Sequence, residues 1–216
     1  MRMERERSLL IEYGKRLVEQ GLTKGTGGNL SIFDRAEGLM AITPSGIDFF
    51  QIQPEDIVLM DLDGHVVEGD RTPSSEWEMH LLEYRNRQDL DAVIHAHTVW
   101  ASVMACLRWP LPAAHYMIAV AGRDVRCAAY ASYGTRELAC NAMQAMTDRK
   151  AVFLANHGIL TGGASIQEAF NVLVQVEYCC EVYLKAKEVG DPVILPDDEM
   201  AKMALKFKTY GQKKGV

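Results

Sequence analysis

The sequence predicts a three-layer α/β/α domain built around a mostly antiparallel, mixed sheet. Short apolar runs of strand length are joined by tight turns, and Asp63-Gly64 between two such runs is a strong hairpin signal. Segments with helical periodicity precede, separate and follow these runs, which is typical of layered α/β domains. Because connections of this length are too short for parallel crossovers, most neighbouring strands are expected to run antiparallel.

The first half of the chain is expected to contain one helix and four strands. Residues 4–20 carry leucine, tyrosine and valine side chains at helical spacing, and Gly21 ends the pattern. The glycine-rich turn GTGGN follows at residues 25–29. Strands are then expected at residues 30–33, 39–43, 57–62 and 66–67.

The second half is expected to be mainly helical. Ser75 and Glu78 have the spacing of a capping box, and so do Ser165 and Glu168, so each pair predicts the start of a helix. The expected order is a helix from residue 75, a strand at 92–97, helices at 99–109 and 136–146, a strand at 151–155, and helices at 165–188 and from Asp197 to Gly211. With no repeat or low-complexity linker, we expect a single domain over residues 1–216.

Charge and hydropathy exclude several classes of protein. The formal net charge of −6 gives no electrostatic support for binding nucleic acid. No apolar run approaches the ~20 residues that span a bilayer, so we expect no membrane partner. The N-terminal MRMERERSLL lacks the apolar core of a signal peptide, and the five cysteines contain no C-x-x-C pair. We therefore expect a cytoplasmic protein with reduced thiols.

Three histidines carry the main functional signal. His95 and His97 end the apolar run DAVIHAHT, and residues two apart in a strand point to the same face. His157 follows a second apolar run, at residues 151–155, and Gly158 is expected to end that strand. Two neutral imidazoles from one strand and a third from another are a common way to hold a catalytic zinc ion. An H-x-H pair alone is equally compatible with two structural histidines.

Glu76 is the second candidate for metal chemistry. An acidic residue at a helix start is stabilised by the helix dipole, which is the simplest interpretation of Glu76. Glu78 fits that role better because it has the capping-box spacing. Glu76 is then free to act as a metal ligand, as a general base, or as both.

Small residues in three segments indicate an anion site. Ser74 and Ser75 lie at a helix start, where free backbone N–H groups bind phosphate. Thr26 and Asn29 add donors within GTGGN, and the segment TPSG at residues 43–46 offers a third turn. Each segment alone is weak evidence, because such residues fill ordinary turns. Neither nucleotide-binding glycine fingerprint fits these spacings.

Taken in order, these motifs resemble the class II, zinc-dependent aldolase family. The resemblance rests on GTGGN, TPSGI, PSSEW, HAH, HYMIA, YGTREL, NHG and KFKTYG, which together span nearly the whole chain. Among the members of that family, the motifs are most similar to those of the bacterial enzymes that cleave L-fuculose 1-phosphate to dihydroxyacetone phosphate and L-lactaldehyde. The resemblance implies the three-layer fold, one zinc ion per subunit, and a homotetramer with active sites between subunits.

The resemblance also implies roles for individual residues. The zinc ligands would be His95, His97, His157 and a movable Glu76, which would also serve as the base. The substrate phosphate would be held by Thr26, Gly28, Asn29, Ser45, Gly46, Ser74 and Ser75. Tyr116 from a neighbouring subunit would act as acid and base on the aldehyde oxygen, and Tyr210 would close over the site. Without the resemblance, Tyr116 is more simply interpreted as a core tyrosine.

Three other functions remain open at this stage. A sugar-phosphate 4-epimerase, such as one acting on L-ribulose 5-phosphate, would break the same bond, retain the aldehyde and re-form the bond. A related zinc lyase would dehydrate a ketose 1-phosphate. Outside enzymes, the same fold occurs in adducin-like head domains, which need no catalytic metal. The intact histidine triad with Glu76 favours an enzyme, and no lysine lies in a pattern that requires Schiff-base chemistry.

Overall fold

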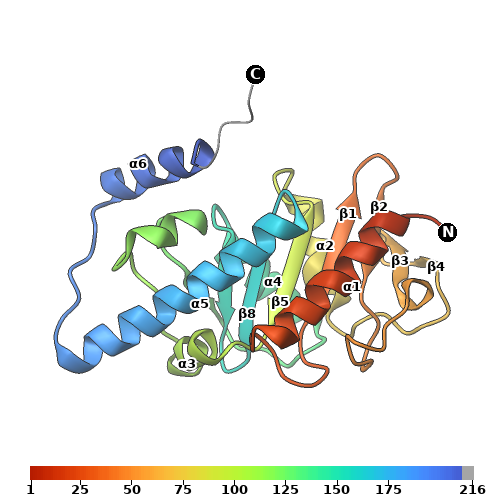
Figure 1. Ribbon diagram of the computed structural model, residues 1–216, viewed down its shortest axis with the longest axis horizontal. Helices are drawn as coiled ribbons and strands as arrows, with labels where there is room; N and C mark the ends of the chain where they lie inside the picture. Colours follow the sequence, from red (N-terminus) through yellow and green to blue (C-terminus); the bar gives the residue numbers. More distant parts are fainter. Residues whose placement is uncertain (211–216) are drawn as a thin grey trace.

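An eight-stranded sheet forms the middle layer of the structure, a computed structural model that describes residues 1–210 (Figure 1). The strands are β1 (Asn29–Asp34), β2 (Leu39–Ile42), β3 (Val58–Asp61), β4 (Val66–Glu68), β5 (Ala92–Ala96), β6 (Arg126–Ala128), β7 (Ala151–Leu154) and β8 (Gly158–Gly163). They follow one another across the sheet in the order β4-β3-β2-β1-β5-β8-β7-β6. Within the described residues β6 and β7 are parallel and all other neighbours antiparallel, which confirms the predicted mixed, mostly antiparallel sheet.

Helices cover both faces of this sheet and complete the predicted three layers. The α-helices are α1 (Glu4–Glu19), α2 (Trp77–Asn86), α3 (Val99–Leu107), α4 (Arg136–Met146), α5 (Ile166–Val189) and α6 (Asp197–Lys208), with short 3-10 segments η1 (Pro54–Asp56) and η2 (Tyr116–Val120). Figure 1 shows α1 and α5 crossing the near face, with α2 and α4 behind the sheet. Two apolar cores result: one joins α1, α3 and α5 to the near face, and the other joins α2 and α4 to the far face.

The last helix, α6, lies apart from these layers. A long segment after α5 carries it across to η2, which α6 contacts (Figure 1). Met200 is buried and belongs to the near-face core. Met203, Ala204 and Phe207 are partly buried and pack against that core. The expected end of the helix at Gly211 lies outside the described residues. In the described part of the chain, no helix is both long and apolar enough to cross a bilayer.

Two strands were not predicted, because their local sequence is poor in strand signals. Strand β8 is the segment GILTGG, whose glycines disfavour strand structure in isolation. It is buried throughout, and a Cβ on Gly163 would lie only 2.7 Å from the backbone nitrogen of Ala169 in α5. Close packing under α5 therefore overrides the weak propensity. Strand β6 has only three residues and depends on its parallel pairing with β7.

Of the two helix starts predicted from capping boxes, the structure contradicts one and confirms the other. The capping box at Ser75 is wrong: α2 begins at Trp77, after a turn in which Trp77 N donates to Ser74 O at 3.1 Å. The Ser165 cap is confirmed, because its Oγ accepts from Glu168 N at 3.2 Å. The five cysteines are unpaired, with Cys179 and Cys180 buried and Cys106 exposed.

Candidate metal centre and active site

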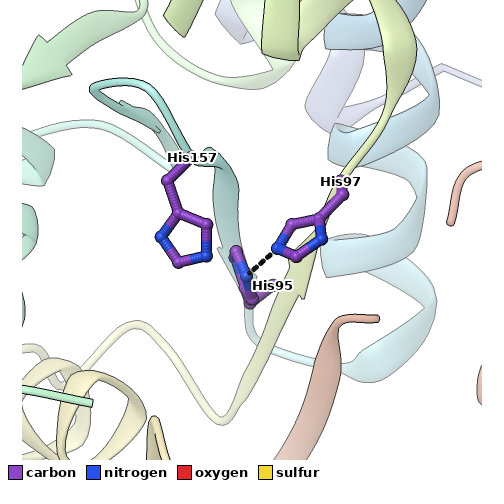
Figure 2. A group of neighbouring side chains, drawn as sticks. All are labelled: His95, His97 and His157. Carbon is purple, nitrogen blue, oxygen red and sulfur yellow. Dashed lines mark hydrogen bonds between the residues drawn. The ribbon is translucent and has the colours of Figure 1, made fainter. Parts of the chain in front are cut away.

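Three imidazoles converge at one end of the central strands. His95 is the fourth residue of β5, His97 follows that strand, and His157 lies in the turn that joins β7 to β8. Because β8 pairs with β5, the turn brings His157 beside the other two (Figure 2). One ligand atom from each ring lies within 4.8 Å of the others, and the Nε2 atoms of His95 and His97 are 2.9 Å apart. The predicted convergence of the H-x-H pair with His157 is therefore present.

Two glycines make room for this arrangement. A Cβ on Gly158 would lie 2.5 Å from the carbonyl oxygen of Ala96 and 2.9 Å from Cδ2 of His97. Gly158 was expected to end a strand, but it begins β8, where only a residue without a side chain fits against the histidines. Gly28 has φ 83°, and a Cβ there would lie 2.6 Å from the carbonyl oxygen of His95. The glycine-rich turn thus packs directly against the end of β5 that carries His95.

The segment after His97 is held by a carboxylate from α5. Glu177 accepts hydrogen bonds from the Thr98 hydroxyl at 2.5 Å, from Trp100 N at 2.8 Å and from Ala101 N at 2.9 Å. The two N–H groups belong to the first turn of α3, where a negative charge is favoured. Glu177 therefore anchors the chain immediately beyond the histidine pair.

The carboxylate of Glu76 lies beside the imidazoles of His95 and His157. Its Oε2 is 3.3 Å from His95 Nε2 and accepts a hydrogen bond from Asn29 Nδ2 at 3.0 Å. Its Oε1 is 3.5 Å from His157 Nε2. The side chain is only 8 % exposed, and Oε1 is buried with no hydrogen-bond partner among the described residues. A buried carboxylate oxygen without a partner is costly unless a cation or proton satisfies it.

Burial favours the neutral, metal-binding form of two of the three histidines. It lowers the pKa of His95 well below the usual value, and it also lowers the pKa of His97, with a further contribution from His157. His95 Nδ1 lies 3.0 Å from the carbonyl oxygen of Ile159, which can only accept a hydrogen bond. The Nδ1 atom must therefore carry the proton, which leaves a lone pair on Nε2, where the other ligands converge. Neutral imidazoles and a partnerless carboxylate oxygen together fit a divalent cation.

A cavity of about 390 Å³ opens in front of this centre. Its lining residues are Thr26, Gly27, Gly28, Asn29, Pro44, Ser45, Gly46, Ser74, Ser75, Glu76, His97, Tyr130, Ala131, Tyr133, Asn156 and His157. Two of the loops are fastened together, since Ser45 N donates to Thr72 O at 3.0 Å and Ser74 N donates to Thr43 O at 3.1 Å. The lining contains hydroxyl groups, two side-chain amides and glycines but no lysine or arginine. The three small-residue segments therefore share one cavity with the histidines.

The structure gathers most of the predicted site residues but not the two tyrosines. All seven residues expected at the phosphate line the cavity, together with Glu76, His97 and His157, and His95 is buried beside them. Tyr116 is absent from the cavity of its own chain. It is 46 % exposed, so it is not the core residue that its pattern first suggested, and it packs against His115 and Phe207. Tyr210 is 88 % exposed and also lies away from the cavity.

Sequence analysis missed several residues of the cavity wall. Tyr133 and Asn156 line the cavity and belong to the motifs YGTREL and NHG, but the motifs alone predicted no role for either residue. Asn156 has φ 54°, and its Oδ1 accepts from Arg108 Nε at 3.0 Å, so it shapes the turn that presents His157. Tyr130 carries no sequence signal. It reaches the cavity because β6 pairs with β7, which places the following loop beside the histidines.

Comparison with known families agrees with this geometry. Residues 8–184 match the family described as the class II aldolase and adducin N-terminal domain. That match covers most of the chain and includes the three histidines and Glu76. The chain therefore belongs to the class II aldolase family, and it is an enzyme of the aldolase class.

Individual relatives cover nearly the whole chain. The 5-deoxy-D-ribulose 1-phosphate aldolase of Bacillus thuringiensis serovar kurstaki is 50 % identical over 98 % of this chain and 100 % of its own length. The L-fuculose phosphate aldolase of Escherichia coli O6:H1 is 40 % identical over 94 % of each chain. A solved structure of an L-fuculose 1-phosphate aldolase is 64 % identical, covers 94 % of this chain and 96 % of its own, and superposes with a TM-score of 0.93.

Proposed function

We propose that this class II aldolase uses one zinc ion to cleave the C3–C4 bond of a deoxyketose 1-phosphate, releasing dihydroxyacetone phosphate and a short aldehyde. The observation that carries the proposal is the convergence of three imidazoles and Glu76 beside a cavity that is also lined by small, hydroxyl-bearing residues suited to an anion. When bound by His95, His97, His157 and Glu76, the metal ion would act as a Lewis acid for negative charge that develops on the ketose.

The chain's own residues handle the protons in this proposal. Glu76 supplies the proton that C3 takes up after the C3–C4 bond has broken. Its Oε2 is engaged by Asn29, so Oε1, which has no hydrogen-bond partner among the described residues, is the oxygen assigned to carry that proton. Tyr116 accepts the proton of the C4 hydroxyl as the aldehyde forms. No lysine lines the cavity, so no described residue there offers an amine for imine formation.

The substrate phosphate is proposed to bind among the small-residue segments of the cavity. Backbone N–H groups of the turns at residues 26–29 and 45–46 and of the segment before α2 are suited to an anion. Hydroxyl groups of Thr26, Ser45, Ser74 and Ser75 add donors. Because no lysine or arginine lines the cavity, binding would depend on these neutral donors and on the metal ion.

Tyr116 and Tyr210 are proposed to act from a neighbouring subunit of a homotetramer. Neither tyrosine lines the cavity of its own chain, and both are exposed. A closed cyclic assembly would give every cavity the same covering surface. Such an arrangement would place the general acid and base for C4 on the side of the substrate away from the histidines.

Two substrates are supported by specific relatives. L-fuculose 1-phosphate is favoured by the name of the 64 % identical structure, and its cleavage would release L-lactaldehyde. 5-Deoxy-D-ribulose 1-phosphate is favoured by the name of the 50 % identical relative, and its cleavage would release a two-carbon aldehyde. Both sugars share the reacting part from C1 to C4 and differ in the length of the aldehyde.

A product assay on purified protein tests the proposal. Metal content is measured first, and the protein is then incubated with the 1-phosphates of fuculose, 5-deoxyribulose, rhamnulose and ribulose. We expect one zinc ion per chain and release of dihydroxyacetone phosphate together with free aldehyde in equal amounts. Conversion of the sugar to an epimer without free aldehyde would instead identify an epimerase, and no reaction with any of the four sugars would contradict the proposed substrate class.

A further inference from the structure

A buried chain of polar side chains runs from the far-face core to Glu76. His80 in α2 is 0 % exposed, and its Nε2 lies 2.5 Å from Asn29 Oδ1. Its Nδ1 lies 2.7 Å from Ser31 Oγ, which is 2.6 Å from the Tyr84 hydroxyl. Asn29 in turn donates to Glu76 Oε2 at 3.0 Å. His80 lies four residues after Glu76, so its position in the sequence is compatible with a hydrogen bond near the site, although a structural histidine is the simpler interpretation.

The spacing of these residues explains why the chain of contacts is continuous. Asn29 and Ser31 are two apart in β1 and point to the same face of the sheet. His80 and Tyr84 are four apart in α2 and lie on the same helix face. Where α2 packs on β1, the side chains of the two pairs alternate, and each side chain forms a hydrogen bond with the other pair. Every polar atom in this contact has a defined partner, as buried groups require.

The direction of each hydrogen bond follows from Glu76. Glu76 Oε2 accepts a hydrogen bond whether Glu76 is ionised or carries its proton on Oε1, so the amide of Asn29 turns its NH2 group toward Glu76 and its oxygen toward His80. The opposite orientation would place the amide oxygen against the carboxylate. His80 must then donate through Nε2–H, and its Nδ1 accepts the hydrogen of the Ser31 hydroxyl. Burial lowers the pKa of His80 to about 3, so the ring holds one proton and only one nitrogen donates.

The orientation of Asn29 matters because this residue also lines the cavity. Its NH2 group has two hydrogens, and Glu76 takes one of them. The second remains for a negatively charged group of the substrate. A reversed amide would instead present an oxygen to two anions, the carboxylate and the phosphate.

We propose that His80 is a positioning residue that locks the Asn29 amide with its NH2 group toward Glu76 and the substrate anion. The inference rests on the proposed function, because it assigns Asn29 to both the base and the phosphate. His80 touches neither group, and it acts only through the amide oxygen that it holds.

Replacing His80 by two residues of similar size separates positioning from packing. His80→Met fills the space but offers no donor, whereas His80→Gln restores an N–H at a similar reach. In His80→Met we expect kcat to fall and KM for the cleaved ketose 1-phosphate to rise, together lowering kcat/KM about 10- to 100-fold with metal content unchanged. His80→Gln should recover most of that loss. The matched control is His65→Met, since His65 is exposed in a turn and should tolerate the change.

A loss of packing alone would reduce the amount of folded protein but leave KM of the folded fraction unchanged. Wild-type KM and kcat in His80→Met, or equal impairment in His80→Gln, would overturn the proposal. Nitrogen-15 NMR of the wild-type protein gives a measurement that needs no variant: we expect Nε2 of His80 to be protonated and Nδ1 not. The reverse tautomer would also overturn it. Absence of aldolase activity in the wild-type protein would contradict the proposed function, and the NMR result would still decide the role of His80.

Discussion

The histidine corner and the tyrosine surface of this protein are built in opposite ways. The histidine corner, comprising His95, His97, His157 and Glu76, lies at the junction of β5 and β8 and is held by buried hydrogen bonds. The tyrosine surface, comprising Tyr116, Phe207 and Tyr210, lies on η2 and the end of α6. Its tyrosines are exposed, and its packing is limited to contacts such as that between Tyr116 and Phe207.

The difference separates the part of the proposed site that lies within one chain from the part that a second chain would supply. Ligands for a metal ion must be fixed closely in space, and the sheet supplies that rigidity to the histidine corner. A proton-transfer group needs only to reach the substrate, so the tyrosine surface can be delivered by a second molecule. The histidine corner is complete within one chain, whereas the tyrosine surface faces outward. The following predictions separate these two halves of the proposed site.

The largest effect is expected in the histidine corner from His95→Ala. Removing one of three imidazoles leaves too few ligands, so metal and activity should be lost together, with turnover falling by at least about 10³-fold. The fold should persist because β5 keeps its apolar residues. Metal analysis, turnover and circular dichroism check this. Full metal content with normal turnover would contradict the zinc assignment, and His65→Ala is the control for loss of a histidine.

Glu76→Gln should separate proton transfer from metal binding. The amide keeps the size and position of the side chain but cannot exchange a proton, so turnover should fall by at least about 10²-fold. Metal should be retained, although less tightly. Exchange of the C3 proton of dihydroxyacetone phosphate with solvent should vanish. Wild-type exchange in this variant would show that another group is the base.

Tyr116→Phe should test whether the tyrosine surface serves a different chain. The variant alone should lose about 10²-fold in turnover, because it lacks one proton-transfer group. When mixed and reassembled with His95→Ala, part of the activity should return, since some interfaces would pair an intact metal site with an intact Tyr116. Subunit exchange is verified by mass spectrometry. A hybrid no more active than its parents would remove Tyr116 from catalysis in a neighbouring chain.

Ser75→Asp should produce a smaller effect confined to substrate binding. Ser75 lines the cavity just before α2, so the substitution places a negative charge where the phosphate is proposed to bind. We expect KM for the phosphorylated ketose to rise by at least about tenfold, with an unchanged thermal midpoint. Steady-state kinetics and thermal unfolding check both statements. An unaffected KM would mean that the phosphate binds elsewhere.

The smallest effect concerns pH and metal-free protein. The folded-state pKa of His80 is about 3, below the value of 6.5 expected when it is exposed by unfolding. The unfolded state therefore takes up the proton first, and the stabilisation present above pH 6.5 is lost as pH falls toward 3. His80 should therefore contribute about 1.4 kcal/mol per pH unit to the slope of the unfolding free energy in that range. Urea unfolding of chelated protein should show a shallower slope for His80→Gln than for wild type, and an equal slope would contradict the burial of a neutral His80.

Much of this protein can be derived from its sequence. Period-two spacing put His95 and His97 on one face, and the turn Asp63-Gly64 indicated antiparallel pairing. The capping box that assigned Glu78 to the helix start was wrong, because α2 begins at Trp77, although Glu76 does lie beside His95 and His157. The first two signals succeed because each depends on residues that are close together along the chain. Local geometry then determines which side chains share a face.

Other features depend on contacts between distant segments. Strand β8 exists because its glycines fit under α5 and against His97, a demand that no local pattern expresses. Tyr130 reaches the cavity through the pairing of β6 with β7, and His80 acquires its partners only where α2 packs on β1. Periodicity reports the face on which a side chain lies, but burial and pairing decide what that face meets. The sequence by itself therefore determined the fold class and the residue types of the candidate metal centre, whereas tertiary packing decided the cavity wall, the orientation of Asn29 and the separation of the tyrosines from the histidines.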